Sequence, residues 1–231
     1  MNEEKGHVHI INQIADDIVK VFTDIGFEVV SSNEIEDEYH NFDALNVPKD
    51  HPARDMQDTF WLATNPASLL RTHTSCAQVR YMEKNKPPFK IVIPGKVYRY
   101  EATDRTHEAQ FHQIEGLVVG ENINMGHLKF ALNNFLKKLF GENTEIRFRP
   151  GYFPFVEPGI EIDMRRKNGE WVEVLGAGMV HPNVLNNVGI DPKKYSGFAF
   201  GAGLDRLAMI KYGIDDIRGL YNGDLRLINQ F

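Results

Sequence analysis

Two stretches of the chain repeat apolar residues every three or four positions, the spacing that places them on one face of an α-helix. Residues 10–25 form the first stretch, which Gly26 follows, and residues 125–140 form the second, which Gly141 follows. Glycine is the commonest residue just beyond a helix end. The apolar positions are Ile10, Ile11, Ile14, Ile18, Val21, Phe22 and Ile25, then Leu128, Ala131, Leu132, Phe135, Leu136 and Leu139. Both stretches are predicted to be helices that bury one face.

Runs of alternating or β-branched residues predict strands in much of the remaining chain. We expect one strand to end at Pro94-Gly95, because these residues interrupt regular pairing. Asn168-Gly169 is typical of a hairpin turn between two strands. The predicted strands are residues 27–30, 60–62, 90–93, 97–101, 111–119, 145–149, 160–164, 171–175 and 197–201.

Three further helices are predicted between these strands. Residues 67–82 follow the break at Asn65-Pro66, a short helix begins at Asp191-Pro192, and a third helix runs from the last strand to Gly213. The run at residues 70–75 is unusual for a helix, because it is rich in polar side chains that compete for backbone hydrogen bonds. The whole pattern predicts an α+β protein with an antiparallel sheet flanked by helices.

Composition narrows the class of protein. The 231 residues are 42% hydrophobic and 25% charged, as expected for one large or two small globular domains. The single cysteine, Cys76, excludes an internal disulfide and a cysteine-rich zinc site, and it is expected to be a small core residue. No apolar run is long enough to span a membrane, so we expect a cytoplasmic protein. The net charge of −6 argues against extensive nucleic-acid contact by this chain alone.

The segment of residues 97–119 reads as two strands joined by a polar, charge-rich loop. Side chains two apart on a strand share a face, so Arg99 and Glu101 lie on one face of the outgoing strand. One face of the returning strand carries Phe111, Gln113 and Glu115. These side chains would make a poor core. They suit a ligand that combines a flat ring, an anionic group and an ammonium.

Two other sequence patterns raise the possibility of a metal site and of a dinucleotide-binding loop. Residues 34–58 form a long irregular segment, and such loops are more often functional than not. Its possible metal ligands lack helical His-x-x-x-His spacing, so no metal site is expected there. These residues are His40, His51, Asp55 and Asp58. The Gly-Ala-Gly run at residues 201–203 lacks the strand–helix–strand context of a dinucleotide loop.

Several motifs follow one another in an order that resembles the class II aminoacyl-tRNA synthetases, and in particular the α subunits of bacterial phenylalanyl-tRNA synthetases. The hairpin resembles motif 2, with Phe111-His112-Gln113-Ile114-Glu115-Gly116 on its returning strand. The other segments are residues 41–45, 51–56, 70–75, 149–158, 173–182 and 197–203. Together they cover nearly the whole chain. The resemblance implies one class II catalytic domain over residues 1–231, with a central antiparallel sheet flanked by helices.

The resemblance also implies an activity. A phenylalanine–tRNA ligase activates phenylalanine with ATP to phenylalanyl-adenylate and transfers it to tRNA(Phe), in an α2β2 heterotetramer with a β subunit. The alternative is a class II paralogue that binds or adenylates an amino acid without charging tRNA, and an inactive interaction subunit is a further rival. The family's motif 1 would place the helix at residues 10–25 at a subunit interface. Its periodicity fits a helix covering its own sheet equally well.

The resemblance assigns roles residue by residue. Arg99 and Arg206 are the expected catalytic residues, and Glu157 is the expected Mg²⁺ ligand, shared with a partner subunit, with Glu173 as a weaker candidate. The expected ATP-binding residues are Arg99, Glu101, His107, Phe111 and Arg206. The expected phenylalanine-binding residues are His73, Ser75, Gln78, Gln113, Glu115, Phe153, Phe155 and Ala199. A carboxylate is already ionised, so catalysis needs positioning and charge stabilisation rather than a general base.

The sequence departs from the family pattern at three places. The helical arm that binds tRNA in the family is not part of this sequence, which is therefore expected to be either a trimmed chain or a lineage without the arm. Gly151 and Gly159 replace the serines that usually flank the aromatic residues, and His9-Ile10 stands where His-Pro is usual. None of these departures removes an expected catalytic residue.

Overall fold

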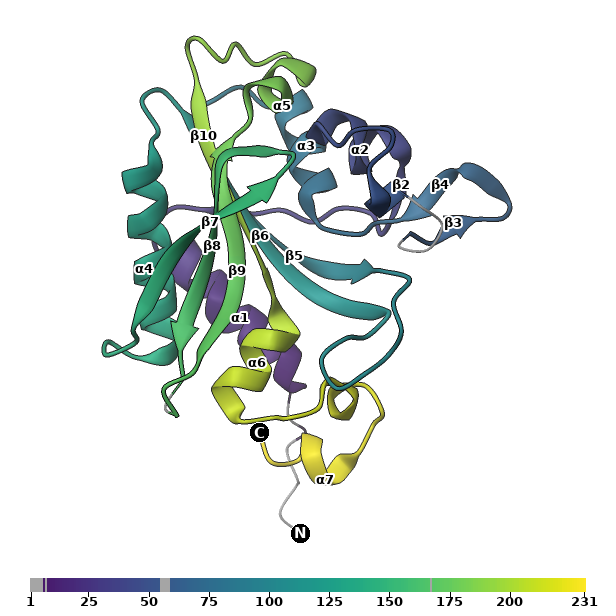
Figure 1. Ribbon diagram of the computed structural model, residues 1–231, viewed down its shortest axis with the longest axis vertical. Coiled ribbons are helices and arrows are strands. Elements are labelled where there is room, and N and C mark those ends of the chain that lie inside the picture. Colours follow the sequence, from purple (N-terminus) through teal and green to yellow (C-terminus); the bar gives the residue numbers. More distant parts are fainter. Residues whose placement is uncertain (1–5, 7, 55–58, 167) are drawn as a thin grey trace.

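The chain folds around a seven-stranded sheet, with a separate three-stranded sheet at its side (Figure 1). The computed structural model describes residues 6, 8–54, 59–166 and 168–231. The large sheet has the order β1-β5-β6-β10-β9-β8-β7, and the small one β2-β4-β3. Within the large sheet only the pair β1–β5 is parallel. The strands are β1 Glu28–Val29, β2 Ile35–Asp37, β3 Trp61–Leu62, β4 Asn65–Leu70, β5 Phe89–Tyr98, β6 Gln110–Gly120, β7 Ile146–Phe153, β8 Val156–Arg165, β9 Trp171–Val180 and β10 Ser196–Gly203.

Helices flank the sheet, so the predicted α+β class with a mostly antiparallel sheet is confirmed. The α-helices are α1 Ile10–Thr23, α2 Glu38–Asn41, α3 Ser75–Lys84, α4 Met125–Phe140, α5 Pro182–Asn187, α6 Leu204–Tyr212 and α7 Leu225–Ile228. Short 3-10 helices are η1 Asp43–Leu45, η2 Pro52–Arg54 and η3 Ile217–Leu220. Among the described residues, no helix is both long and apolar enough to cross a bilayer.

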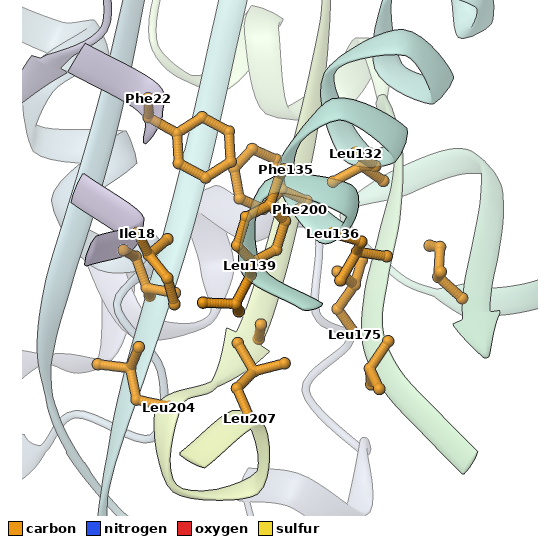
Figure 2. Close-up of a cluster of buried hydrophobic side chains, with 14 of the residues drawn as sticks. Ile18, Phe22, Leu132, Phe135, Leu136, Leu139, Leu175, Phe200, Leu204 and Leu207 are labelled. Carbon is orange, nitrogen blue, oxygen red and sulfur yellow. The ribbon is translucent and has the colours of Figure 1, made fainter. Parts of the chain in front are cut away.

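The side chains of α1, α4 and α6 cover one face of the large sheet, where they form the larger core (Figure 2). Phe22 of α1 lies at its centre, with ring centroids 4.9 Å from Phe200, 5.1 Å from Phe27 and 5.2 Å from Phe135. The predicted apolar stripes of both long helices are largely buried in this core. The amphipathic pattern therefore identified the helices and the faces that they bury.

The opposite face of the sheet is covered by α3, α5 and the segment around η1. Strand β10 shows the alternation, because Phe198 and Phe200 enter the larger core while Ala199 belongs to the second one. On β6, Leu117 and Val119 face this second core. Gln113 and Glu115 lie on the same face, nearer the hairpin loop. The functional side chains therefore occupy the part of this face where the apolar cover ends.

The predicted helix at residues 67–82 is wrong in its first half. Residues 65–70 form β4, which pairs with β2 and β3, and helix α3 begins only at Ser75. Arg71 is buried between them, and its guanidinium donates to the carbonyl oxygens of Ser32, Asn33 and Lys96. The polar run at residues 70–75 is thus a tertiary connection, as its poor helix propensity suggested.

The strand predicted to stop at Pro94-Gly95 continues to Tyr98. Strand β1 pairs with β5 only at Ile91 and Val92, so beyond that point β5 is an edge strand, where proline is tolerated. Arg99 was predicted on a separate strand of residues 97–101, but it directly follows Tyr98, the last residue of β5. Its backbone N–H still donates to the carbonyl oxygen of Ala109, which closes the loop of residues 99–109.

Two other details differ from prediction. The short helix expected at Asp191-Pro192 is a turn, in which the backbone N–H of Tyr195 donates to the carbonyl oxygen of Asp191. A helix forms earlier instead, at α5, where Pro182 occupies the first turn and the His181 side chain accepts from the Asn183 N–H. Proline fits the first helical turn because its missing N–H would have no helical partner there.

Candidate functional site

The first of two adjoining cavities has a volume of about 530 Å³ and lies on the face of the sheet covered by α3. The eight residues expected to bind phenylalanine all line it: His73, Ser75, Gln78, Gln113, Glu115, Phe153, Phe155 and Ala199. They come from the loop before α3, α3 itself, β6, the β7–β8 hairpin and β10. The fold thus gathers residues that are as much as 126 positions apart, from His73 to Ala199.

Glu115 lies buried at the polar end of this cavity. Its carboxylate accepts from Ser75 Oγ at 2.6 Å, from Gln78 Nε2 at 2.7 Å and from the backbone N–H of Thr74 at 3.2 Å. Burial raises the pKa of Glu115, while these three hydrogen bonds act in the opposite direction. Glu115 therefore holds the start of α3 in place as well as adding a carboxylate to the cavity wall.

Two polar atoms of the cavity wall lack partners within the described part of the chain. His73 Nδ1 and Gln113 Oε1 are both buried without a hydrogen bond. Burial, followed by the charge of nearby Arg99, lowers the pKa of His73 to about 3, so its ring is neutral at physiological pH. A buried polar atom without a partner is costly, and such atoms in a cavity wall indicate a ligand that satisfies them.

The other end of the cavity is apolar. The rings of Phe153 and Phe155 lie 5.9 Å apart between centroids, with an interplanar angle of 24°. Phe153 can lie against the sheet because a Cβ at Gly176 would come within 2.7 Å of its ring. Aliphatic and small residues complete this end, namely Val156, Ala177, Val180, Val184 and Ala199. The cavity therefore suits a molecule with one charged end and one apolar end.

The hairpin that carries Phe153 and Phe155 lies at one edge of the sheet. Strand β7 is at the edge, and Pro154-Phe155 forms the turn that leads into β8. Tyr152, the third aromatic residue, points largely into solvent, with 81% of its surface exposed. Tyr152 also lines the cavity, but the enclosed part of the apolar wall is formed by Phe153 and Phe155.

The second cavity has a volume of about 430 Å³ and shares part of its wall with the first. All five residues expected to bind ATP line it: Arg99, Glu101, His107, Phe111 and Arg206. The guanidinium of Arg99 lies 5.1 Å from the centroid of the Phe111 ring. Arg206 extends from the first turn of α6, and its guanidinium donates to the carbonyl oxygen of Glu173 at 3.2 Å. Arg166, which was not expected here, also lines the cavity, so three cations and an aromatic face surround this space.

Arg99 lines both cavities, together with Glu101, Gln113 and Glu173. Its Nε donates to the carbonyl oxygen of Thr72 at 3.1 Å, which fixes the side chain between the hairpin and the loop before α3. Molecules bound in the two cavities would therefore meet at one guanidinium. The arrangement can bring two anionic groups together and neutralise both.

Glu157, the expected metal ligand, lines neither cavity. Its side chain is 75% exposed, and its carboxylate forms an ion pair with His181 at 3.3 Å.

Among the described residues, the carboxylate and histidine groups close enough to share an ion are Glu36, Asp37 and His40 instead. The guanidinium of Arg80 already pairs with Glu36, with Nε 3.0 Å from Oε1. Asp55 and Asp58, which were weighed as ligands, lie outside the described residues.

Two glycines of this site, Gly176 and Gly201, were not among the residues predicted from the sequence. Gly176 and Gly201 are register partners, and together they form the floor of both cavities. A Cβ at Gly201 would come within 3.2 Å of Glu115 Cγ. The alternation of glycine along these strands is the signal that could have identified them, since glycine in a strand often marks a close approach.

The chain is similar in sequence to known proteins. The family model described as "tRNA synthetases class II core domain (F)" matches residues 1–231. A phenylalanine–tRNA ligase alpha subunit from Dehalococcoides mccartyi is 54% identical over 242 residues, covering 98% of this chain and 70% of the relative. One from Vibrio vulnificus is also 54% identical, over 228 residues, covering 99% of this chain and 69% of the relative.

A solved structure shows the same fold at lower identity. The chain matches pyrrolysyl-tRNA synthetase from Desulfitobacterium hafniense with a TM-score of 0.73 and 18% identity, covering 94% of this chain and 75% of that one. Identity this low supports the fold alone. The closer relatives and the matching family model extend the result, and the chain therefore belongs to the class II aminoacyl-tRNA synthetases, within the family of phenylalanine–tRNA ligase alpha subunits.

Proposed function

We propose that this chain forms the catalytic domain that activates phenylalanine with ATP, giving phenylalanyl-adenylate and pyrophosphate, and that it then transfers phenylalanine to tRNA(Phe) in the cytoplasm. The observation that carries the proposal is the position of Arg99 at the junction of the two cavities. The reaction joins two anions, because the amino-acid carboxylate attacks the α-phosphorus of ATP. A fixed cation where the two meet is what this reaction requires.

Each cavity suits one substrate. In the first, the phenyl ring would lie against Phe153 and Phe155, and the ammonium would be close to Gln113 and Glu115, where a buried acceptor lacks a partner. In the second, adenine would stack on Phe111. Arg206 would hold the terminal phosphates with its planar, permanently charged guanidinium. Glu101 and His107 would complete the ATP site.

Catalysis in this arrangement comes from placement. The carboxylate nucleophile is ionised, so no residue has to remove a proton, and holding it in line with the α-phosphorus lowers the entropic cost of reaction. The Arg99 guanidinium has two edges that can bind the carboxylate and the α-phosphate together. It would neutralise the charge that develops as the new bond forms and pyrophosphate leaves.

Magnesium would accompany ATP and neutralise the leaving pyrophosphate. Glu157 offers one exposed carboxylate to a second Mg²⁺, which prefers six oxygen ligands. Within the described residues no cluster of acidic and histidine groups includes Glu157, so the remaining ligands would come from water and from a β subunit. We therefore propose that Glu157 lies at the contact with β, in an α2β2 assembly.

The proposal is tested by amino-acid-dependent exchange between ATP and labelled pyrophosphate, with this chain purified together with a bacterial β subunit. We expect exchange with phenylalanine to exceed that with tyrosine by about a hundredfold, because an apolar cavity rejects an added hydroxyl only to that extent. Exchange that prefers another amino acid would contradict the proposal. Exchange without aminoacylation of tRNA(Phe) would favour the paralogue alternative.

Ala199 is predicted to limit the depth of the phenylalanine cavity. It is 8% exposed and lies on β10 between two bulky phenylalanines that face the opposite core. Ala199→Gly should favour para-substituted phenylalanines by about 1–3 kcal/mol in kcat/KM relative to phenylalanine, because it opens space at the end of the cavity. The measurement is pyrophosphate exchange with 4-chlorophenylalanine and phenylalanine.

The matched control is Ala202→Gly. Ala202 is on the same strand and 1% exposed, but it faces the larger core and lines neither cavity. The Ala202→Gly variant should lose the same backbone rigidity but keep the parent's preference between phenylalanine and 4-chlorophenylalanine. An Ala199→Gly variant with the parent's ratio of the two activities would show that Ala199 does not set the depth.

A further inference from the structure

At the wall of the ATP cavity, which Asp205 lines, three residues form a closed hydrogen-bonded cluster that we call the Asp205 cluster: Asp205, Tyr221 and His112. The Asp205 carboxylate is 2% exposed. One of its oxygens accepts from the backbone N–H of His112 at 2.7 Å, and the other accepts from the Tyr221 hydroxyl. The same hydroxyl lies 2.9 Å from His112 Nδ1, and the two rings are nearly parallel, with centroids 6.1 Å apart.

Each member of the cluster is next to a part of the ATP site. His112 stands between Phe111 and Gln113 on β6, with its side chain on the opposite face of the strand. Asp205 directly precedes Arg206. The cluster therefore joins the strand that carries the proposed adenine-stacking ring to the helix that carries the proposed phosphate-binding cation.

Tyr221 connects the cluster to the hairpin loop through η3. It follows η3, and the backbone N–H of Ile217 in η3 donates to the carbonyl oxygen of Arg105 at 3.0 Å. Arg105 belongs to the loop of residues 99–109, which carries Glu101 and His107. Figure 1 shows this loop beside the C-terminal segment. Strand β6, helix α6 and the residue after η3 thus meet at a single buried carboxylate, and η3 is in turn bonded to the hairpin loop.

The buried Asp205 carboxylate requires that the hydrogen bonds of the cluster stay in place. A buried carboxylate is costly unless hydrogen bonds satisfy both oxygens. Burial raises the pKa of Asp205, and hydrogen bonds from Tyr221 and His112 oppose that shift. Burial, together with the charge of Asp205, also raises the pKa of Tyr221, so its hydroxyl remains protonated and donates. Moving α6 away from β6 would break the bond from the His112 N–H, and moving the segment after η3 would break the bond from Tyr221.

We propose that Tyr221 and Asp205 are positioning residues for ATP, which hold Phe111, Arg206 and the hairpin loop at a fixed separation across the cavity. This inference rests on the proposed function, because it assigns ATP to that cavity. Tyr221 does not line the cavity, and Asp205 lines it with both carboxylate oxygens already accepting hydrogen bonds, so the role assigned to both is to position other groups. Phenylalanine, which binds on the other side of Arg99 and has no contact with α6 in this assignment, should be little affected.

The test compares Tyr221→Phe with the unchanged chain, each purified with a bacterial β subunit. The variant keeps the ring that stacks on His112 but leaves one Asp205 oxygen without its donor. Loss of a hydrogen bond to a charged group predicts a rise of about tenfold in the KM for ATP, with the KM for phenylalanine within about twofold. The control is Tyr81→Phe, which also removes a tyrosine–carboxylate bond, to Glu28 at 2.8 Å, but away from both cavities.

A second variant, Asp205→Asn, shows whether the two residues act as one unit. If they do, the double variant with Tyr221→Phe should raise the KM for ATP no more than the worse single variant, because neighbouring residues in one network are non-additive. Full additivity, an unchanged KM for ATP in Tyr221→Phe, or an equal rise in the KM values for both substrates would each overturn the proposal.

A direct measurement separates this inference from the proposed function. Calorimetric titration with a non-hydrolysable ATP analogue reports ATP affinity without any amino acid. Weaker binding of the analogue by Tyr221→Phe, together with normal binding by Tyr81→Phe, would support the positioning role even if phenylalanine were not the amino acid activated. Equal binding by the unchanged chain and both variants would reject the positioning role, even where exchange with phenylalanine upholds the function.

Discussion

Replacing Arg99 by alanine is expected to slow phenylalanyl-adenylate formation by roughly two to three orders of magnitude, the usual effect of removing one donor that stabilises developing charge. Arg99 lines both cavities, and its Nε is fixed on the Thr72 carbonyl oxygen, so the cation is held in place before substrates bind. Such preorganisation acts in the transition state more than in the ground state. The loss should therefore fall mainly on kcat.

Two companion variants make the result specific. Arg99→Lys keeps the charge but not the two-edged geometry, so it should recover only part of the lost rate. Arg226→Ala removes an arginine of α7 whose side chain is 90% exposed, and it should leave the rate unchanged. The measurement is the single-turnover rate of adenylate formation by rapid quench. Parent-like formation in a folded Arg99→Ala variant would remove Arg99 from the mechanism.

Phe22→Ala is expected to lower the free energy of unfolding by about 3–5 kcal/mol, the range for truncating a fully buried aromatic side chain. Phe22 has no exposed surface and contacts the rings of Phe27, just before β1, Phe135 of α4 and Phe200 of β10, so its loss leaves a cavity between these parts of the core. Strand β10, which carries Phe200, also carries Ala199 and the floor of both cavities. We therefore expect a loss of activity to accompany the loss of stability.

Phe130→Ala is the matched control for the core. Phe130 is on α4, but its side chain is 72% exposed, so its truncation should change stability by no more than about 0.5 kcal/mol. Urea denaturation followed by circular dichroism measures both variants. If the two variants had similar unfolding midpoints, Phe22 would not be the centre of the larger core.

The pattern of apolar positions was sufficient to predict α1 and α4, because an amphipathic helix needs only its own sequence to show which side it buries. Helix α4 has the predicted bounds, Met125–Phe140. The alternation on β6 likewise placed Phe111, Gln113 and Glu115 on one face, and all three line the cavities. Motif resemblance predicted which residues gather, and the fold brings together every residue expected to bind ATP or phenylalanine.

Tertiary structure decided what local patterns could not. Residues 65–70 form a strand because β2 and β3 supply partners on both sides, and Arg71 is buried because distant carbonyl oxygens accept its hydrogen bonds. Pro94 stays within a strand because β1 ends before it and leaves that edge unpaired. These outcomes depend on β2, on the carbonyl oxygens that accept from Arg71 and on where β1 ends, all of which lie outside the local sequence that a propensity describes.

The same distinction separates the identity of the site residues from their arrangement. The sequence alone determined that Arg99 and Arg206 are cations, that Phe111 is aromatic and that Glu157 is a carboxylate. Only the fold decided that Arg99 joins two cavities, that Glu157 lies outside both, and that Asp205 and Tyr221 meet at the wall of the ATP site. Burial and hydrogen-bond geometry depend on which strands become neighbours, and that choice is made by the packing of the whole chain.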